Sequence, residues 1–388
     1  MFGSFPEGFI WGTATAAHQV EGGNWNNDWW AWEHAPGTPC AEPSGDACDH
    51  LHRYPGDLAL LAALGFASYR FSVEWSRVEP EAGEFSTAAL GHYDRMVDEC
   101  LGLGMEPVVT LHHFTNPRWV AGMGGWAEPD TAGRFGSFAG TVARRLGDRV
   151  SRFCTINEPN IVATIGYLAG IFPPGDQDPG RRDLAVRVLA AGHRQAVAAV
   201  RSASPARVGL TLALPEWVAV DGGDEVLEAM RAPDEDPFFA ATGGDDFIGV
   251  QTYTRNRVGP SGLLGPEQGV PTTLMGYEFW PEALEAAIRR AHTVTSLPVL
   301  VTENGIAAAD DTQRIEYVRR ALEGVLRCLA DGVPVQGYTY WSAFDNFEWA
   351  LGYGPTFGLI AVDRATQERT VKPSARWLGE VARRNSLG

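Results

Sequence analysis

The amino-acid sequence predicts a single (β/α)8 barrel, and three observations lead to that fold class. Short apolar runs alternate with amphipathic helical segments along the chain, and no linker interrupts them. The runs are continuously apolar, as in parallel strands that are buried on both faces. Polar and aromatic residues follow the ends of these runs, where a barrel gathers its loops on one face. We expect one barrel domain over residues 1–388.

Each expected strand is a run rich in β-branched, Leu or aromatic residues. The expected strands span residues 9–14, 68–73, 107–111, 151–156, 207–213, 247–253, 299–302 and 336–341. Each expected helix has apolar residues spaced three or four positions apart. The expected helices span residues 57–64, 87–102, 131–146, 182–202, 225–232, 281–292, 312–329 and 373–383. In this order, the segments form the repeating strand–helix units of a barrel.

A doubly wound sheet with a dinucleotide site is the alternative fold. That fold carries a Gly-x-Gly-x-x-Gly turn after its first strand, and this chain has none there. Its ligand also binds at one switch point, whereas the polar residues here follow all the expected strands. The pattern therefore favours the barrel, and it argues against a dehydrogenase.

Charge and composition narrow the class of ligand. The net charge is −17, which argues against nucleic acid or an anionic membrane as a partner because phosphate binding needs a basic surface. The chain has 13 Trp and 10 Tyr, more than its core requires. Because the apolar C–H faces of sugar rings stack on aromatic side chains, the composition favours a carbohydrate ligand.

The cysteines indicate neither zinc nor a disulfide framework. Cys100, Cys154 and Cys328 lie in apolar segments and are expected to be buried thiols. Cys40 and Cys48 share a loop, where a disulfide remains an alternative. We expect no metal site and a reducing, cytoplasmic location. The first residues lack the pattern of a secretory signal, and no apolar run approaches the ~18 residues of a membrane span.

Two glutamates carry the strongest chemical signal. Glu158 lies in Thr-Ile-Asn-Glu-Pro (155–159), and Glu303 lies in Val-Thr-Glu-Asn-Gly (301–305). Each ends an apolar run and precedes a turn residue, as expected at the carboxyl end of a barrel strand. A glutamate at one such site is often only a solvated loop residue. Two such sites, each beside an asparagine, favour a pair in which one carboxyl protonates a leaving oxygen and the other attacks carbon.

Hydrogen-bonding and aromatic residues accompany the other expected strands. They suit a neutral polyol ring, because each sugar hydroxyl needs a donor and an acceptor. The residues are Gln19, Arg70, His112, His113, Asn157, Tyr253, Trp341, Glu348 and Trp349. Adjacent strand residues point to opposite faces, so His112 and His113 are not expected to share a metal ion.

Four further motifs stand in register with the two glutamate motifs. They are Phe-Ile-Trp-Gly-Thr-Ala-Thr-Ala-Ala-His-Gln-Val-Glu-Gly (9–22), Tyr-Arg-Phe-Ser-Val-Glu-Trp-Ser-Arg (69–77), Thr-Leu-His-His-Phe (110–114) and Asp-Asn-Phe-Glu-Trp (345–349). Together the six motifs resemble, in order, those of glycoside hydrolase family 1, the β-glucosidase and β-galactosidase family, and the first is similar to the N-terminal signature of that family. The resemblance covers essentially the whole chain.

The resemblance implies a retaining mechanism without a cofactor. Glu303 is the expected nucleophile, and Arg70 and Tyr253 are expected to hydrogen-bond it and keep it ionised. Glu158 is the expected general acid and later the base, about 5–5.5 Å from the nucleophile. Asn157 is expected to bind the sugar 2-hydroxyl. The resemblance implies that the rest of the sugar is held by Gln19, His113, Trp341, Glu348 and Trp349.

Further details of the motifs bear on substrate choice. Glu348 and Trp349 form the pattern for a free sugar 6-hydroxyl, which implies a non-phosphorylated β-hexoside, most simply a β-glucoside. Phe114 replaces the usual Trp of the family, and Gln251 replaces the usual Asn. The loops after the fourth to sixth strands look short for the family. These departures suggest a wider or atypical acceptor side.

Three alternatives stand beside a general β-glucosidase. A transglycosidase would use the same two glutamates and pass the sugar to an alcohol. A deglycosylating enzyme for a specialised metabolite would fit the departures at Phe114 and Gln251. A non-catalytic sugar-binding barrel would be expected to lack one of the glutamates or Arg70, and all three are present. The sequence leaves open the aglycone, the choice between gluco and galacto sugars, and the oligomeric state.

Overall fold

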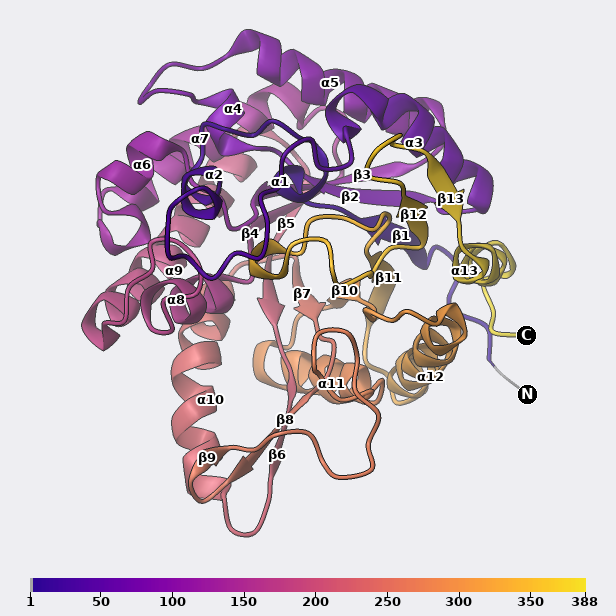
Figure 1. The fold of residues 1–388 in the computed structure, drawn as a ribbon. Helices are drawn as coiled ribbons and strands as arrows, with labels where there is room; N and C mark the ends of the chain where they lie inside the picture. The colour runs from indigo at the N-terminus through magenta and orange to yellow at the C-terminus, as the bar shows by residue number, and fades with distance from the viewer. Residues whose placement is uncertain (1–2) are drawn as a thin grey trace.

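Parallel strands close into a barrel in the computed structural model, which describes residues 3–388. Their order around the barrel is β1-β11-β10-β7-β5-β4-β3-β2, so barrel strands that follow one another in the chain are neighbours in space. They are β1 (Ile10–Ala14), β2 (Ser68–Ser72), β3 (Glu106–His112), β4 (Arg152–Asn157), β5 (Arg207–Ala213), β7 (Phe247–Gln251), β10 (Val299–Asn304) and β11 (Val335–Trp341). The predicted (β/α)8 fold is confirmed, and every predicted strand overlaps one of these strands (Figure 1).

Long helices surround the barrel on its outer side (Figure 1). They are α3 (His50–Leu64), α5 (Thr87–Gly102), α7 (Thr131–Leu146), α9 (Pro179–Ala203), α10 (Asp224–Phe239), α11 (Ala283–Thr295), α12 (Asp311–Ala330) and α13 (Pro373–Arg384). Each overlaps a predicted helix. The core lies between these helices and the strands, where apolar side chains of both layers are buried.

Two helices extend past their predicted limits and include prolines. Helix α3 begins before Pro55, and α10 continues through Pro233. Proline removes a backbone donor and usually ends or kinks a helix. In α10 the residues beyond the prolines include Phe238 and Phe239, which are both buried, so packing offsets the lost hydrogen bond.

Short strands and helices that the sequence pattern did not predict lie in the loops between the barrel elements. Among them, β6 (Glu216–Ala219), β8 (Arg255–Gly259) and β9 (Gly262–Leu263) form a small sheet that projects from the barrel (Figure 1). A second small sheet pairs β12 (Ile360–Val362) with β13 (Arg369–Val371). The helical ones are α1 (Ala17–Val20), α2 (Asp28–Glu33), α4 (Trp75–Val78), α6 (Arg118–Gly122), α8 (Pro159–Tyr167), η1 (Gly125–Ala127), η2 (Ala240–Thr242) and η3 (Trp349–Leu351).

The cysteines are as predicted, and residues 3–388 contain neither a membrane-spanning helix nor a metal-binding cluster. All five cysteines are free thiols, and Cys100, Cys154 and Cys328 are buried as expected, so Cys40 and Cys48 form no disulfide. Within residues 3–388, no helix is both long enough and apolar enough to cross a membrane. The same residues contain no cluster of three or more His, Cys, Asp or Glu that could bind a metal ion.

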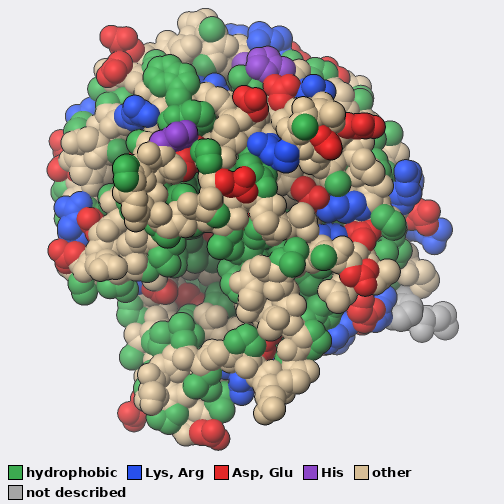
Figure 2. All heavy atoms as spheres, viewed as in Figure 1, with side chains coloured by type: hydrophobic (Ala, Val, Ile, Leu, Met, Phe, Trp, Pro, Cys, Tyr) green, Lys and Arg blue, Asp and Glu red, His purple; other side chains and the backbone are tan. Residues whose placement is uncertain are grey.

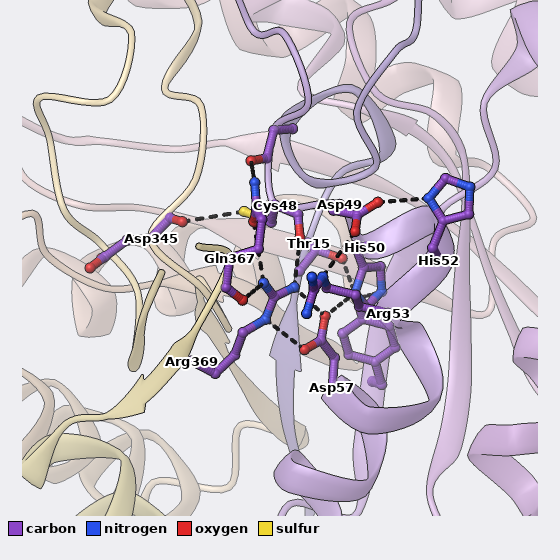
Figure 3. Close-up of polar contacts among 12 residues, drawn as sticks. Thr15, Cys48, Asp49, His50, His52, Arg53, Asp57, Asp345, Gln367 and Arg369 are labelled. Atoms are coloured by element: carbon purple, nitrogen blue, oxygen red, sulfur yellow. Dashed lines mark hydrogen bonds and ion pairs between the residues drawn. The ribbon is translucent and has the colours of Figure 1, made fainter. Parts of the chain in front are cut away.

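A buried polar network joins the C-terminal part of the chain to α3 (Figure 3). Arg369 of β13 makes two hydrogen bonds of 2.8 Å to the Asp57 carboxylate, and the same carboxylate contacts His50 Nδ1 at 2.8 Å. His50 Nε2 lies 3.0 Å from the Tyr69 hydroxyl of β2. Burial raises the pKa of Asp57, but the hydrogen bonds from His50 and Arg369 outweigh it and lower that pKa overall.

The same network reaches the loop that follows β11. Arg369 Nη2 donates to the carbonyl oxygen of Cys48 at 2.6 Å, and the Cys48 thiol donates to the carbonyl oxygen of Asp345 at 3.3 Å. Asp345 also pairs with Lys372 at 2.8 Å. The network therefore fixes the start of the segment 345–349, which carries predicted sugar-binding residues.

Replacing Asp57 with Asn should lower the free energy of unfolding by about 3–5 kcal/mol, because Arg369 would be left buried without its carboxylate. Chemical denaturation at neutral pH measures this loss. The matched control is Arg53→Gln, which breaks the exposed Arg53–Asp49 pair of the same helix region and should cost less than about 1 kcal/mol. Equal effects of the two substitutions would contradict the assignment of Asp57 as the centre of this network.

Candidate active site

A cavity of about 380 Å³ opens at the carboxyl ends of the barrel strands. Figure 2 shows the molecular face that is hollowed over the carboxyl ends of β5 and β7, and hydrophobic side chains border this hollow. Seven of the ten predicted site residues line the cavity. They are His113, Glu158, Tyr253, Glu303, Trp341, Glu348 and Trp349. Gln19, Arg70 and Asn157 lie behind them and hold them by direct or shared hydrogen bonds.

The backbone presents several of these side chains through conformations that non-glycine residues rarely adopt. Glu158, at the end of β4, has φ 46°, Phe114 has φ 71° and Trp349 has φ 52°. A left-handed backbone is costly for bulky residues and persists only where the surrounding packing enforces it. Phe114 and Trp349 pack against each other with ring centroids 5.1 Å apart. The packing of the cavity wall thus holds these residues in place.

Glu303 is buried among hydrogen-bond donors. Its Oε1 accepts from Arg70 Nη1 at 2.5 Å and from Gln251 Nε2 at 2.8 Å, and its Oε2 accepts from the Tyr253 hydroxyl at 2.5 Å. The predicted contacts with Arg70 and Tyr253 are present. Burial raises the pKa of Glu303 overall, and the Arg70 guanidinium and the Tyr253 hydroxyl limit that rise. These donors favour the ionised carboxylate.

Asn157 has a fixed amide orientation. Its Oδ1 accepts from Arg70 Nη2 at 2.6 Å and from Gln251 Nε2 at 2.8 Å. Because both donors contact the oxygen, the Nδ2 group is the other end of the amide. This buried Nδ2 group has no hydrogen-bond partner among residues 3–388. It is therefore an unused buried donor beside the donors that hold Glu303.

Glu158 has a different environment from Glu303. No side-chain donor within residues 3–388 hydrogen-bonds its carboxyl group, although the group lines the same cavity. Burial raises the pKa of Glu158 well above its usual value, and the charges of Glu303 and Glu348 raise it further against the lowering effect of Arg70. Glu303 therefore ionises first, and Glu158 keeps its proton.

Glu348 is the third carboxyl group of the cavity. Gln19 Nε2 donates to its Oε2 at 3.4 Å, and the same nitrogen donates to the carbonyl oxygen of Phe347 at 2.8 Å. Burial and the charge of Glu303 raise the pKa of Glu348 to about 8, and the hydrogen bond from Gln19 limits the rise. Around neutral pH this group can both donate and accept a hydrogen bond.

The two adjacent histidines lie on opposite faces of the barrel wall, as predicted. His113 stacks on Trp341 with ring centroids 5.7 Å apart and lines the cavity. His112 contacts Trp126 edge to face at 5.2 Å on the helix side. The pair is therefore split between the two layers, and only His113 is available to a ligand.

Sequence reasoning did not assign a role to Gln251 or Phe114, which it noted only as departures from the family pattern. Gln251 donates to both Glu303 and Asn157. Phe114 lines the cavity beside Phe172, with ring centroids 5.7 Å apart. The available signal was position, because Gln251 lies near the end of the predicted strand 247–253, two residues before the predicted site residue Tyr253.

Comparison with known proteins identifies the family. The sequence profile described as glycosyl hydrolase family 1 matches residues 1–241 and 248–387. The chain belongs to glycosyl hydrolase family 1. As a member of this family, the protein is a glycoside hydrolase, and the cavity with its two glutamates is the site where this activity is expected.

Related proteins cover nearly the whole chain. It is 37% identical to the thermostable β-glucosidase B of Thermobispora bispora, over 99% of this chain and 92% of that protein. The β-glycosidase BGL167 has a crystal structure with a TM-score of 0.93 and 49% identity, covering 98% of this chain and 97% of that one. The family 1 β-glucosidase of Thermotoga maritima gives a TM-score of 0.92 at 32% identity, covering 99% of this chain and 100% of that one.

This chain is shorter than the Thermobispora protein, although the alignment covers nearly the whole of both chains. The alignment with the Thermobispora protein extends over 439 positions, whereas this chain has 388 residues, so that relative carries segments that are missing here. This agrees with the expectation of shortened loops. Their location after the fourth to sixth strands stays a prediction.

Replacing Gln251 with Leu should lower kcat/KM about tenfold to a hundredfold, because Glu303 and Asn157 would each lose a buried donor. Hydrolysis of p-nitrophenyl β-glucoside measures the loss, and a thermal melt establishes that the variant is folded. Gln336→Leu is the matched control, since Gln336 lies near the amino end of β11, away from the cavity, and should retain activity. A Gln251→Leu variant within twofold of the wild type would contradict a role for this amide.

Proposed function

We propose that this protein is a retaining β-glucosidase, with Glu303 as nucleophile and Glu158 as acid and base. The observation that carries the proposal is the contrast between two carboxyl groups of one cavity. Three donors hold Glu303, whereas Glu158 has none within residues 3–388 and has the higher pKa. Two carboxyl groups whose environments separate their pKa values in this way suit a nucleophile and a general acid.

The first half-reaction uses both groups at once. Glu303 attacks the anomeric carbon from the α face while Glu158 donates its proton to the departing glycosidic oxygen. The bond to the aglycone breaks, and the sugar becomes an α-linked ester of Glu303. The free Nδ2 of Asn157 is suited to the sugar 2-hydroxyl, where a hydrogen bond strengthens as positive charge develops on the ring.

The second half-reaction releases the sugar. Glu158, now ionised, takes a proton from water, and the water oxygen attacks the anomeric carbon from the β face. The ester bond to Glu303 breaks, and the product keeps its β configuration. Arg70 and Tyr253 stabilise the carboxylate that leaves.

The remaining predicted cavity residues, together with Gln19 behind them, are proposed to hold the sugar. Aromatic rings provide a stacking floor and polar groups bind hydroxyls; the residues are Gln19, His113, Trp341, Glu348 and Trp349. Among the described residues that line the cavity, none is Lys or Arg. A 6-phosphate would therefore meet Glu348 without a compensating cation, which supports a non-phosphorylated glucoside.

Names of relatives support glucosides and hydrolysis. The Thermobispora and Thermotoga proteins are called β-glucosidases, and a Bifidobacterium breve relative, 35% identical over 96% of this chain and 97% of its own length, is called a bifunctional β-D-glucosidase/β-D-fucosidase. These names favour a glycoside hydrolase over an enzyme that transfers the sugar to an alcohol. We further propose one catalytic domain over residues 1–388 and a cytoplasmic location, which the free cysteines support.

Replacing Glu303 with Ala should lower the kcat for p-nitrophenyl β-glucoside by about 10⁴-fold or more, because no carboxylate remains to attack. Added azide should restore turnover and yield the α-glucosyl azide, since the anion attacks from the side that Glu303 occupied. Glu158→Ala is the matched control, and with azide it should yield the β-glucosyl azide. Product stereochemistry by NMR decides the assignment, and exchanged products for the two variants would reverse the roles.

The pH dependence of kcat/KM should show a basic limb that reports Glu158. The acid acts only when protonated, so activity is full below its raised pKa and falls as the pH rises through that value. Glu158→Gln should abolish this limb in assays with an activated aryl glucoside. Glu348 also titrates at a pKa of about 8, so Glu348→Gln is the necessary control. Loss of the limb in Glu348→Gln and not in Glu158→Gln would refute the assignment.

A further inference from the structure

The cavity has a polar base and an apolar entrance. Its polar lining groups are the three carboxyls, His113, Tyr253, Tyr277 and the indoles. The other described lining residues are apolar, and none is Asn, Gln, Ser or Thr. They are Phe114, Ile161, Ile165, Ile171, Phe172, Met275, Ala350, Leu351 and Phe357.

Several lining side chains at the entrance, two of them aliphatic and one the ring of Tyr277, are exposed to solvent. Ile171 is 41% exposed, Leu351 is 45% exposed, and Tyr277 is 40% exposed. Two further exposed side chains, Leu168 and Leu274, lie within three residues of these positions in the chain. An exposed apolar patch that borders a cavity marks a binding surface for an apolar group.

The position of this patch relative to Glu158 shows which part of the substrate it meets. Helix α8 begins directly after Glu158 and carries Ile161 and Ile165, which are four residues apart and share one face. Glu158 is the group that would protonate the leaving oxygen. Side chains on its own helix, within two turns of it, therefore lie where the leaving group departs.

We infer that this entrance binds an apolar alkyl or aryl leaving group in preference to a second sugar; the inference rests on the proposed function. A sugar in this position would bury hydroxyls against Ile165, Ile171 and Leu351, which offer no hydrogen bonds. An alkyl chain or aromatic ring gains from the same contacts. An anionic leaving group would approach Glu158 and Glu348 without a cation in the described lining.

A homologous series of alkyl β-glucosides tests this inference. Methyl, butyl, hexyl and octyl glucosides have leaving groups of similar basicity, so differences in kcat/KM report binding of the chain. We expect kcat/KM to rise about threefold for each added methylene until the entrance is filled. The kcat/KM for hexyl glucoside should exceed that for cellobiose by about tenfold or more, although glucose is a better leaving group than hexanol.

Two variants connect the effect to the entrance. Leu351→Asn changes an exposed side chain that contributes little to folding, and Ile165→Asn changes one on α8. Each should lower the ratio of kcat/KM for hexyl over methyl glucoside about threefold to tenfold. The control is Val294→Asn, at a side chain that is 48% exposed on α11, and it should keep the wild-type ratio.

Hydrolysis of β-glucosyl fluoride separates the inference from the proposed function, because fluoride is too small to use the entrance. The inference is wrong, and the glucosidase assignment stands, if glucosyl fluoride is hydrolysed while kcat/KM does not rise along the alkyl series. The same conclusion follows if glucosyl fluoride is hydrolysed while cellobiose is a better substrate than hexyl glucoside. If glucosyl fluoride is not hydrolysed, both fail. A rising series that Leu351→Asn or Ile165→Asn flattens and Val294→Asn leaves intact supports the inference.

Discussion

The buried ion pair between Arg70 and Glu303 is the interaction on which the rest of the site depends. Both side chains are almost fully excluded from water, so either charge would strongly destabilise the folded protein without the other. Arg70 lies on β2 and Glu303 on β10, and two other strands separate them around the barrel. The pair thus spans the barrel interior, and Asn157 of β4 and Gln251 of β7 join it through shared hydrogen bonds. The network therefore ties the carboxylate of Glu303 to side chains from three other barrel strands.

The negative charge of Glu303 influences the protonation of the other two carboxyl groups in the cavity. Once Glu303 is ionised, its field raises the pKa of both Glu158 and Glu348, in addition to the effect of their burial. Glu158 lacks the donors that Glu303 has, so the proton stays on Glu158. The acid therefore needs no dedicated partner to hold its proton: a charged neighbour and an apolar wall suffice.

The barrel and its polar residues could be predicted from sequence because both follow from local pattern. Buried parallel strands appear as continuous apolar runs, and Glu158 and Glu303 stand where such runs end. The extension of α10 through Pro233 could not be predicted, because the burial of Phe238 and Phe239 in the folded protein decides it. Ile161 and Ile165 resemble core residues in sequence. Only the placement of α8 beside the cavity distinguishes them.

The apolar entrance and the acid chemistry are parts of one arrangement. Ile161 lies one helical turn from Glu158, so the surface suited to an apolar leaving group is also a surface that keeps water from the acid. An apolar group bound there would displace further water and favour the protonated form of Glu158. A sugar in the same place would bring hydroxyls and their water with it. The identity of the leaving group and the strength of the acid are thus coupled through the first turns of α8.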